Sequence, residues 1–317
     1  MGPHVRVVRG LATAMLCLAW GCRGGEDGGR PGELREPLPV QGPYLGQAPP
    51  GMMPKRFGPE AILATRDWFW HGSPEFSRDG LTMYWSIYER SGRMALAFTE
   101  ARPEGWSSPR APAFASGDGE NQPRFSSDGR SILYVSAHGA GHVLRVSRAG
   151  SGWTRPEPLE LPVPRGMGMG WQFCIVADGS IYADADLGGG DGLDLFRFPW
   201  TGDRYGAPEA VSVNTGYSET APYVTPDESL MVFASNRPGG RGRHDLWVAF
   251  KRRDGTWSRP LNLGPSINSR GEDGFPTITP DGLYLFFTSN RRGDRGYNPY
   301  WVSSRVIEDL KARADLG

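Results

Sequence analysis

The chain has little that would direct it to nucleic acid, to a disulfide framework or across a membrane. Its 317 residues carry 35 Lys and Arg against 35 Asp and Glu, so no net charge draws it to nucleic acid or to anionic lipid. Of its three cysteines, Cys17 and Cys22 belong to an N-terminal export signal, which leaves Cys174 alone and provides no disulfide framework. The apolar run Leu11–Trp20 is too short to span a bilayer.

Sequence motifs of common enzymes are also missing. The sequence contains no G-x-S-x-G elbow, P-loop, H-E-x-x-H or C-x-x-C pair, so no hydrolase is indicated by motif. Cys174 lies in the apolar run Phe173–Val176, where a small core residue is the expected role. His138 and His142 flank a Gly-Ala-Gly loop without a third ligand at a fixed spacing, which favours an exposed polar loop over a metal site.

The N-terminus indicates export. Arg6 and Arg9 precede the apolar run in the order of a secretory signal. The segment Leu18–Cys22 (LAWGC) resembles a bacterial lipobox, in which the cysteine becomes the lipid-modified first residue. Residues 1–22 are therefore predicted to be a signal peptide with lipidation at Cys22, and an ordinary signal peptide with an incidental cysteine is the alternative.

Residues 23–56 are rich in Gly and Pro and have no apolar periodicity, so we expect a disordered tether. The predicted location is the periplasm or the outer membrane, with the cell surface as a further site. The membrane contact is expected through the lipid anchor only.

One phrase recurs five times in the rest of the chain: a polar residue, usually a Pro, a turn built on Asp and usually Gly, then an apolar strand. Its aspartates are spaced by 49, 50, 49 and 54 residues. A period near fifty filled with strand-like segments is typical of a propeller. The five anchoring residues are Asp79, Asp128, Asp178, Asp227 and Asp281.

Each repeat predicts a four-stranded antiparallel sheet. In the fourth repeat, strands are expected at 221–225, 230–235, 245–250 and 257–263, joined by tight polar turns. The predicted fold is all-β, a single β-propeller of five such blades over residues 57–305. Six blades are the alternative, but they would require strand-like sequence in the tether, which contains none.

The fifth repeat lacks its fourth strand and runs directly into a short C-terminal tail, residues 306–317, for which a helix is one expected conformation. Gly58–Leu63 matches Ala207–Val211, the segment before the fourth blade. We therefore expect Gly58–Leu63 to be the outer strand of the last blade and to close the ring.

The phrases SNRPGGRGRHDLWVA and WSRPLNLGPSINSRGEDGFPTITPDG resemble the WD-repeat-like propeller repeats of TolB-type proteins, and the similarity extends over roughly residues 57–305. The resemblance implies a propeller, an exported or periplasmic setting and, often, protein contacts. It does not imply one activity.

Three residues before the Pro or its equivalent, the repeats carry different side chains, and symmetry would gather them around the propeller axis. A ring of carboxylates and an imidazole is suited to binding a cation or a polyol, or to acid–base catalysis in a glycosidase. The alternative is that each acid caps its own turn or accepts backbone N–H groups. The residues are His71, Glu120, Gly170, Glu219 and Asp273, with Glu272 beside the last.

The loops between second and third strands are expected on the same face. Blade three offers an acidic cluster that is a weak calcium candidate against a solvated Gly-rich turn: Asp184, Asp186, Asp191 and Asp194. Blades four and five offer basic side chains suited to carboxylates or phosphates of a partner, although such tips are often only solvated. These are Arg237, Arg241, Arg243, His244, Arg291, Arg292 and Arg295.

Together these features predict a non-catalytic, monomeric envelope lipoprotein whose channel face binds a protein, peptide or glycan. Its binding residues would be His71, Glu120, Glu219, Glu272, Asp273, Arg237, Arg241 and Arg243. No cofactor is expected, Ca²⁺ being the open alternative. The competing hypothesis is a carbohydrate-active propeller enzyme that uses the channel carboxylates.

Overall fold

The computed structural model describes residues 38, 40–59, 68–89, 91–117, 119–136, 142–186, 192–291 and 297–314, which lie in the unit Glu33–Gly317. The predicted signal peptide, Cys22 and the first part of the predicted tether lie outside these residues.

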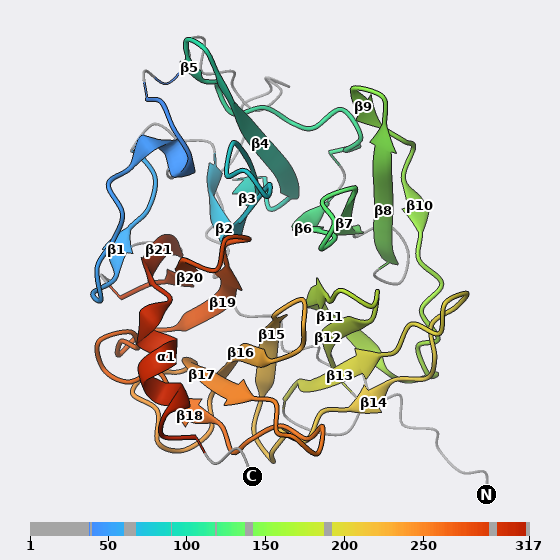
Figure 1. Ribbon diagram of the computed structural model, residues 1–317. Coiled ribbons are helices and arrows are strands. Elements are labelled where there is room, and N and C mark those ends of the chain that lie inside the picture. Colours follow the sequence, from blue (N-terminus) through green and yellow to red (C-terminus); the bar gives the residue numbers. More distant parts are fainter. Residues whose placement is uncertain are drawn as a thin grey trace, which may run out of the picture. The chain divides into compact units, whose positions relative to one another are not determined.

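The described strands form five antiparallel sheets arranged in a ring, as Figure 1 shows. Blade one is β2 (Trp68–Phe76), β3 (Thr82–Glu89), β4 (Met94–Arg102) and β5 (Gly105–Trp106). Blade two is β6 (Asn121–Phe125), β7 (Ser131–Ser136), β8 (His142–Ala149) and β10 (Glu157–Pro158), with β9 (Gly152–Trp153) also on β8. Blade three is β11 (Gly168–Ile175), β12 (Ile181–Asp186), β13 (Asp194–Phe198) and β14 (Glu209–Ala210). Blade four is β15 (Glu219–Val224), β16 (Leu230–Ser235), β17 (Asp245–Phe250) and β18 (Leu261–Asn262). Blade five is β19 (Asp273–Ile278), β20 (Tyr284–Ser289), β21 (Asn298–Ser303) and β1 (Lys55–Arg56). The five-bladed all-β prediction is confirmed.

The repeated aspartates form the turn between the first two strands of each blade. In blade two, Asp128 accepts hydrogen bonds from the Ser126 hydroxyl at 2.6 Å and from the Arg130 N–H at 2.9 Å, and these bonds lower the pKa of its carboxyl. Gly129 has a φ of +70°, a conformation that glycine adopts without strain. Blade four places Glu228 at the same point with a φ of +55°.

The ring is closed by the N-terminal part of the unit, as expected, but not by the expected residues. Lys55 pairs with Trp301 and Arg56 with Tyr300, and the Phe57 N–H donates to the Pro299 carbonyl at 2.9 Å. The prediction of a closing strand at Gly58–Leu63 is therefore wrong, and residues 60–63 lie outside the described part of the chain. The physical reason is the buried Phe57 ring, which fixes the pairing just upstream of it.

The predicted tether is likewise too long. Residue 38 and residues 40–57, here called the clasp, pack on blades one and five. Leu38 exchanges backbone hydrogen bonds with Trp106 on the outer edge of blade one, and the Tyr44 hydroxyl donates to Asp281 of blade five at 2.7 Å. Leu38 and Tyr44 are each 8% exposed, so isolated apolar residues in a Pro- and Gly-rich stretch are enough to hold it down.

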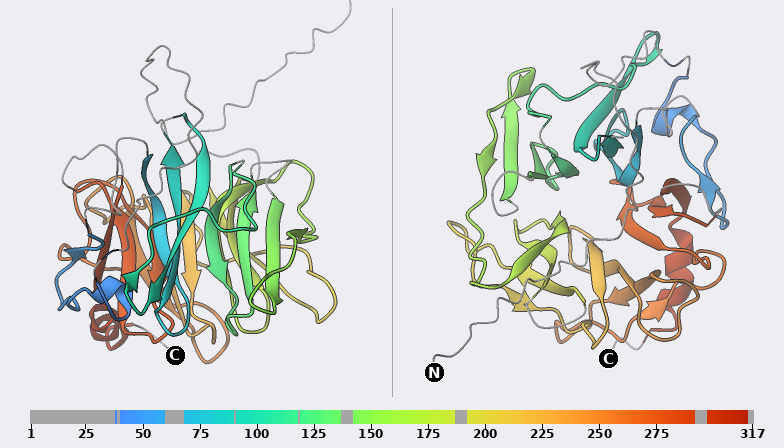
Figure 2. Two further views of the ribbon diagram at one scale, coloured as in Figure 1. Left: turned by 90° about the horizontal axis from the view of Figure 1, so that it is seen from above. Right: turned by 180° about the vertical axis from the view of Figure 1, so that it is seen from behind.

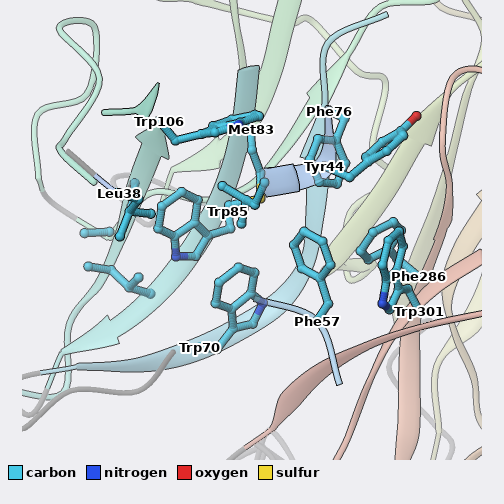
Figure 3. Close-up of a cluster of buried hydrophobic side chains, with 14 residues drawn as sticks. Leu38, Tyr44, Phe57, Trp70, Phe76, Met83, Trp85, Trp106, Phe286 and Trp301 are labelled. Atoms are coloured by element: carbon cyan, nitrogen blue, oxygen red, sulfur yellow. The ribbon is translucent and has the colours of Figure 1, made fainter. Parts of the chain in front are cut away.

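The clasp completes the largest aromatic cluster of the fold, drawn in Figure 3. Phe57 lies edge-on to Phe286 and Trp301, with ring centroids 4.8 and 5.2 Å away, and 5.9 Å from Phe76. Trp70 and Trp85 stack in parallel at 5.2 Å in blade one. Side chains of the clasp, the first blade and the last blade thus share one core.

After β21 the chain forms α1 (Arg305–Lys311), which buries Ile307 against the core of blades four and five. Among the described helices none is long and apolar enough to cross a membrane.

The inner strands β2, β6, β11, β15 and β19 surround the axis of the ring. They all start on one side of the ring, here called the channel face, and the Asp–Gly turns lie on the opposite side, here called the turn face. Figure 2 shows the blade-one strands rising above the others on the channel face.

Candidate functional site: the axis and the channel face

Five side chains at equivalent positions form a closed ring at the axis. Each directly follows the Pro, or the Phe in blade three, of its inner strand, and we call the set the central ring: Glu75, Arg124, Cys174, Tyr223 and Thr277. Contacts made by these residues cross all five interfaces between neighbouring blades.

An ion pair joins blades one and two in this ring. Arg124 Nη1 lies 3.2 Å from Glu75 Oε2, and Arg124 Nε donates to the Phe173 carbonyl of blade three at 3.1 Å. Glu75 also accepts the Phe125 N–H at 3.0 Å, and Thr277 Oγ1 of blade five lies 3.5 Å from its Oε2. Burial raises the pKa of the Glu75 carboxyl, and the Arg124 guanidinium opposes that rise.

The remaining interfaces are closed by weaker contacts. The Val224 N–H of blade four points to Cys174 Sγ at 3.3 Å, and the Tyr223 hydroxyl donates to the Ile278 carbonyl of blade five at 3.3 Å. Burial raises the pKa of the Cys174 thiol to about 12, so this thiol stays protonated at neutral pH. This agrees with the role of a small core residue.

The predicted channel carboxylates are buried and serve the loops that enter each blade. Glu120 accepts the backbone N–H groups of Ser116 and Gly117 at 2.7 and 3.0 Å. Glu219 accepts the Thr215 N–H at 2.7 Å, and Asp273 accepts the Ser269 N–H at 2.5 Å.

All three acids are at most 2% exposed and bond backbone four residues upstream, which is a capping role. They therefore do not present free carboxylates to the axis.

Two of the predicted arginines complete these caps. Arg237 lies 3.0 Å from Glu219 and stacks its guanidinium over the Phe233 and Trp247 rings. Arg291 repeats the arrangement in blade five, 2.9 Å from Asp273. The Arg237 side chain is 9% exposed and paired with Glu219, so it stabilises its own blade.

Blades one and three break the pattern. His71 takes the acid position of blade one, where its ring lies 5.2 Å from the Phe275 ring, and burial lowers its pKa to about 4. In blade three, a Cβ on Gly170 would stand 1.9 Å from Asp184 Oδ1, so a side chain there would displace that carboxylate.

The acidic cluster of blade three is only partly described. The Asp184 carboxylate is buried and accepts the Gln172 N–H at 3.1 Å, the Ala221 N–H at 3.0 Å and the Thr220 hydroxyl. Asp191 lies outside the described residues, as do Arg292, Arg295 and His138. Asp186 is half-buried, and no set of three metal-binding side chains occurs within the described ranges.

Exposed basic side chains remain on the channel face of blades four and five. Arg241, Arg243 and Arg270 are exposed, and the Arg243 side chain is 82% accessible. Glu272 lies beneath them, with Arg243 Nε 3.5 Å from its Oε1 and the Tyr297 hydroxyl bonded to its Oε2.

Their loops are tied together. The Arg243 N–H donates to the Gly271 carbonyl at 3.0 Å, and Asp245 accepts the N–H groups of Arg241 and Gly242 at 2.6 and 2.9 Å. The face thus carries three exposed guanidinium groups on loops that hydrogen bond to one another, and one of these groups, that of Arg243, also contacts Glu272.

Sequence reasoning did not find the central ring or Arg270. The central-ring residue has a different chemistry in every repeat, so a comparison of the repeats does not single it out as a shared feature. The sequence does show that this repeat position carries charged Glu and Arg in the first two blades and uncharged residues in the other three. Arg270 directly precedes the Gly-Glu-Asp of the fifth repeat and has no other basic residue beside it in the sequence, so it does not mark a basic loop.

The strand order and pairing define a five-bladed β-propeller. No protein-family model matches the chain, and no curated protein sequence matches it. Among solved structures it is similar to a putative TolB from Agrobacterium tumefaciens, with 18% identity over 69% of each chain and a TM-score of 0.46.

It is also similar to TolB from Acinetobacter baumannii, with 14% identity and a TM-score of 0.46, covering 76% of this chain and 55% of that one. An oligogalacturonate lyase from Vibrio parahaemolyticus has 12% identity and a TM-score of 0.39, over 75% and 66% of the two chains. All three TM-scores are below 0.5, so the propeller fold of this chain is established by its own strand order and pairing. Function has to be argued from the side chains.

Proposed function

We propose that this protein is a non-catalytic binding scaffold of the cell envelope whose channel face docks a protein partner through an acidic segment. The observation that carries the proposal is the group of exposed Arg241, Arg243 and Arg270 on tied loops, here called the basic patch. Guanidinium groups bind carboxylates in a planar, bidentate geometry. Loops that are already ordered lose less conformational entropy when they bind.

The charge around the patch supports an acidic partner. Glu272 is the nearby acid, and its carboxylate already contacts Tyr297 and Arg243. In the caps of blades four and five, Glu219 and Asp273 are paired with Arg237 and Arg291, so these pairs add no net negative charge beside the patch. Exposed Tyr217, 49% accessible on the loop before blade four, adds an aromatic contact of the kind that interfaces favour.

The test reverses the charge of the basic patch. The variant Arg241→Glu/Arg243→Glu/Arg270→Glu and a control, Arg130→Glu/Arg253→Glu on the turn face, are immobilised beside the wild type and incubated with solubilised envelope of the source cell. Arg130 and Arg253 are exposed and lie in the turns after β6 and β17, so the control changes charge without touching the patch.

We expect a protein retained by wild type and control to be lost with the patch variant, and its retention to fall with rising salt. Equal retention by the wild type and the patch variant, at every salt concentration, would contradict the proposal.

The competing hypothesis of a carbohydrate-active enzyme needs two free carboxylates facing one open site. Glu120, Glu219 and Asp273 instead accept backbone N–H groups, and two of them are also paired with arginines. No contact in the described part of the chain favours this hypothesis over the scaffold.

The proposal includes a lipid anchor at Cys22, supported by the signal-like N-terminus and the lipobox resemblance. It places the propeller at the periplasmic or outer-membrane surface, as a monomer. Cys22→Ser should move the protein from the membrane fraction to the soluble fraction, because one lipidated cysteine would be its only anchor. Unchanged sedimentation with membranes would refute the anchor while leaving the docking proposal standing.

A further inference from the structure

Exposed apolar side chains gather on the turn face, beside the clasp. Met53 is 63% exposed, Leu283 54%, Met52 43% and Leu81 38%. Among the side chains that the structure describes, the only other large apolar one with such exposure is Tyr217, which belongs to the channel face. We call Met52, Met53, Leu81 and Leu283 the turn-face patch.

The end of β21 holds the clasp part of the patch beside blade five. The Ser303 N–H donates to the Gly51 carbonyl at 3.0 Å. The next residue, Ser304, donates its N–H to the Leu283 carbonyl at 2.9 Å. The two methionines, which directly follow Gly51, therefore lie near Leu283.

Tyr44 of the clasp joins blade one to this group. Its N–H donates to the Gly80 carbonyl at 3.3 Å, and its hydroxyl donates to Asp281 at 2.7 Å. Gly80 directly precedes Leu81, and Asp281 lies two residues before Leu283. Figure 2 (left) shows the clasp in blue and α1 in red at the same edge of the ring.

The turns themselves do not require leucine at these two positions. In all five blades the residue at this repeat position donates its backbone N–H to the Asp of the turn, whatever its side chain. The other three blades have Arg130, Ser180 and Ser229 there. Leucine thus occurs only in the two blades that the clasp contacts, and such a local concentration of exposed apolar side chains is typical of an interaction surface.

The patch is small, which limits the kind of contact it can make. A stable protein interface takes about 20–30 residues from each partner, far more than these four side chains. A much weaker contact is sufficient when a tether already holds the two surfaces together, because the tether gives the second contact a high effective concentration.

The described chain enters the propeller on the turn face. Close after Leu38, the Gln41 side chain donates to the Pro103 carbonyl at 3.3 Å. Pro103 lies in the turn between β4 and β5, which is on the turn face because the antiparallel β4 begins on the channel face.

The distance along the chain to the proposed lipid anchor is short. Residues 23–37 separate Cys22 from Leu38, which is a linker of fifteen residues. A random coil of that length has a root-mean-square extension of about 20 Å. A compact unit of the size of Glu33–Gly317 is about 50 Å across, so the face that carries Leu38 meets the bilayer more readily than the opposite face.

Exposed charges of both signs lie around the patch, so no net field selects a charged partner. The bases are Lys55, Arg78 and Arg305, and the acids are Asp79, Asp281 and Glu308. Apolar contact is then the main contribution that the patch offers, and a bilayer of neutral lipid is a sufficient partner for it.

We propose that the turn-face patch lies in the headgroup interface of the lipid bilayer to which the chain is tethered, so that the channel face points away from the membrane. Flexible Met and Leu side chains are suited to such an irregular apolar contact. The inference rests on the anchor of the proposed function for its tether, and it shares no residue with the basic patch.

The test supplies the anchor chemically, so that it does not depend on processing of Cys22 in cells. The chain Cys22–Gly317, which contains the whole compact unit, is coupled through the Cys22 thiol to a maleimide lipid in phosphatidylcholine vesicles. Cys174 is buried and its pKa is raised to about 12, so it does not react. Hydrogen exchange is followed by mass spectrometry for the coupled protein and for the uncoupled protein without vesicles.

Two variants separate the patch from the rest of the turn face. Leu81→Glu/Leu283→Glu places charges in the patch, and the control Arg130→Glu/Ser229→Glu places them at the same repeat position in blades two and four. All four side chains are exposed, so both variants should keep the melting temperature of the uncoupled protein within about 2 °C of the wild type.

We expect coupling to slow exchange in peptides from the clasp and from the β19–β20 turn at least about threefold in the wild type and in the control, with channel-face peptides unchanged. The patch variant should lose this slowing. The proposal is overturned if the wild type shows no slowing on the turn face or if the patch variant is slowed equally. It is also overturned if uncoupled protein shows the same slowing as its concentration rises, which would assign the patch to a second copy of the chain.

The outcome is separable from that of the anchor itself. If Cys22→Ser leaves the protein with the membranes in cells, the natural anchor is refuted, while the chemically anchored protein still reports on the patch. If the patch shows no protection on vesicles, the proposed anchor still stands.

Discussion

Replacing Arg124 by Met would test how the propeller holds its axis together. The substitution removes the cation 3.2 Å from Glu75 and leaves a carboxylate whose side chain is 15% exposed without its counter-charge. Breaking a buried ion pair from one side costs about 3–5 kcal/mol. At about 2–4 °C per kcal/mol for a domain of this size class, the melting temperature should fall by about 6–20 °C.

The loss should depend on pH in a defined direction. Burial raises the pKa of the Glu75 carboxyl, and Arg124 is the group that opposes this, so the pKa of Glu75 should rise further in Arg124→Met. A carboxyl whose folded pKa is raised destabilises the folded state above that pKa and has no effect below its unfolded pKa of about 4.3. The loss should therefore be larger near pH 7 than near pH 5.

The measurement is urea unfolding of the wild type, Arg124→Met and Glu75→Gln/Arg124→Met at both pH values. Gln still offers an oxygen to the Phe125 N–H that bonds Glu75 at 3.0 Å, so the double variant should recover most of the stability at neutral pH. An Arg124→Met protein as stable as the wild type near pH 7, or equally destabilised at both pH values, would refute this account of the axis.

Three further predictions concern the clasp and the channel face. Phe57→Ala should lower the free energy of unfolding by about 3–5 kcal/mol, because it empties a fully buried position among three aromatic rings. Met53 is 63% exposed, so the control Met53→Ala should change the free energy of unfolding by less than about 0.5 kcal/mol. Similar values for both variants would mean that the clasp is not part of the core. Gly105→Ala should weaken the packing of the clasp on blade one, because the new Cβ would lie 2.3 Å from the Leu38 carbonyl oxygen. Limited proteolysis should then cut the clasp faster than in the wild type. An unchanged cleavage rate would argue against that contact. Because burial lowers the pKa of His71 to about 4, the unfolded chain takes up a proton first, so stability should fall as pH drops from 6.5 toward 4 and His71→Gln should flatten that slope.

The repeated features of the fold could be predicted from sequence because their chemistry is local. Each Asp of the repeated phrase bonds an N–H two residues later, so residues adjacent in the sequence are enough to define the turn, as Asp79 does with Leu81 at 3.0 Å. Each such turn lies between the first and second strands of its blade, so the five turns locate the five blades. Five blades and their order could therefore be derived without a three-dimensional model.

The clasp could not be predicted because it depends on single apolar residues that meet distant partners. Leu38, Tyr44 and Phe57 are scattered through a stretch rich in Gly and Pro, and composition alone predicts a flexible segment there. Their partners, such as Trp106 and Asp281, lie far along the chain. The match of Gly58–Leu63 to the segment before blade four therefore predicts the closing strand a few residues downstream of Lys55–Arg56, where the structure has it.

At the candidate site, sequence symmetry indicated the right strands and left two roles open for the acids, binding at the axis or capping a loop. It correctly placed Glu120, Glu219 and Asp273 at equivalent points, but repetition of an acid in three blades reflects a shared loop cap. The residues that differ between blades, Glu75 and Arg124 among them, meet at the axis, and only the closed ring brings them together.

The clasp also has a consequence for how the protein is made. Lys55 leaves the ribosome long before its partner Trp301, and the pairing between them spans most of the chain. Four blades can fold in order of synthesis, but the ring can be sealed only when the last blade arrives, and contacts of such sequence separation form slowly. Until then Phe57 lacks its partner Trp301, and once β21 has been made its outer edge stays unpaired until Lys55 and Arg56 pair with it, so a second nascent copy can compete for that edge during the final step of biogenesis.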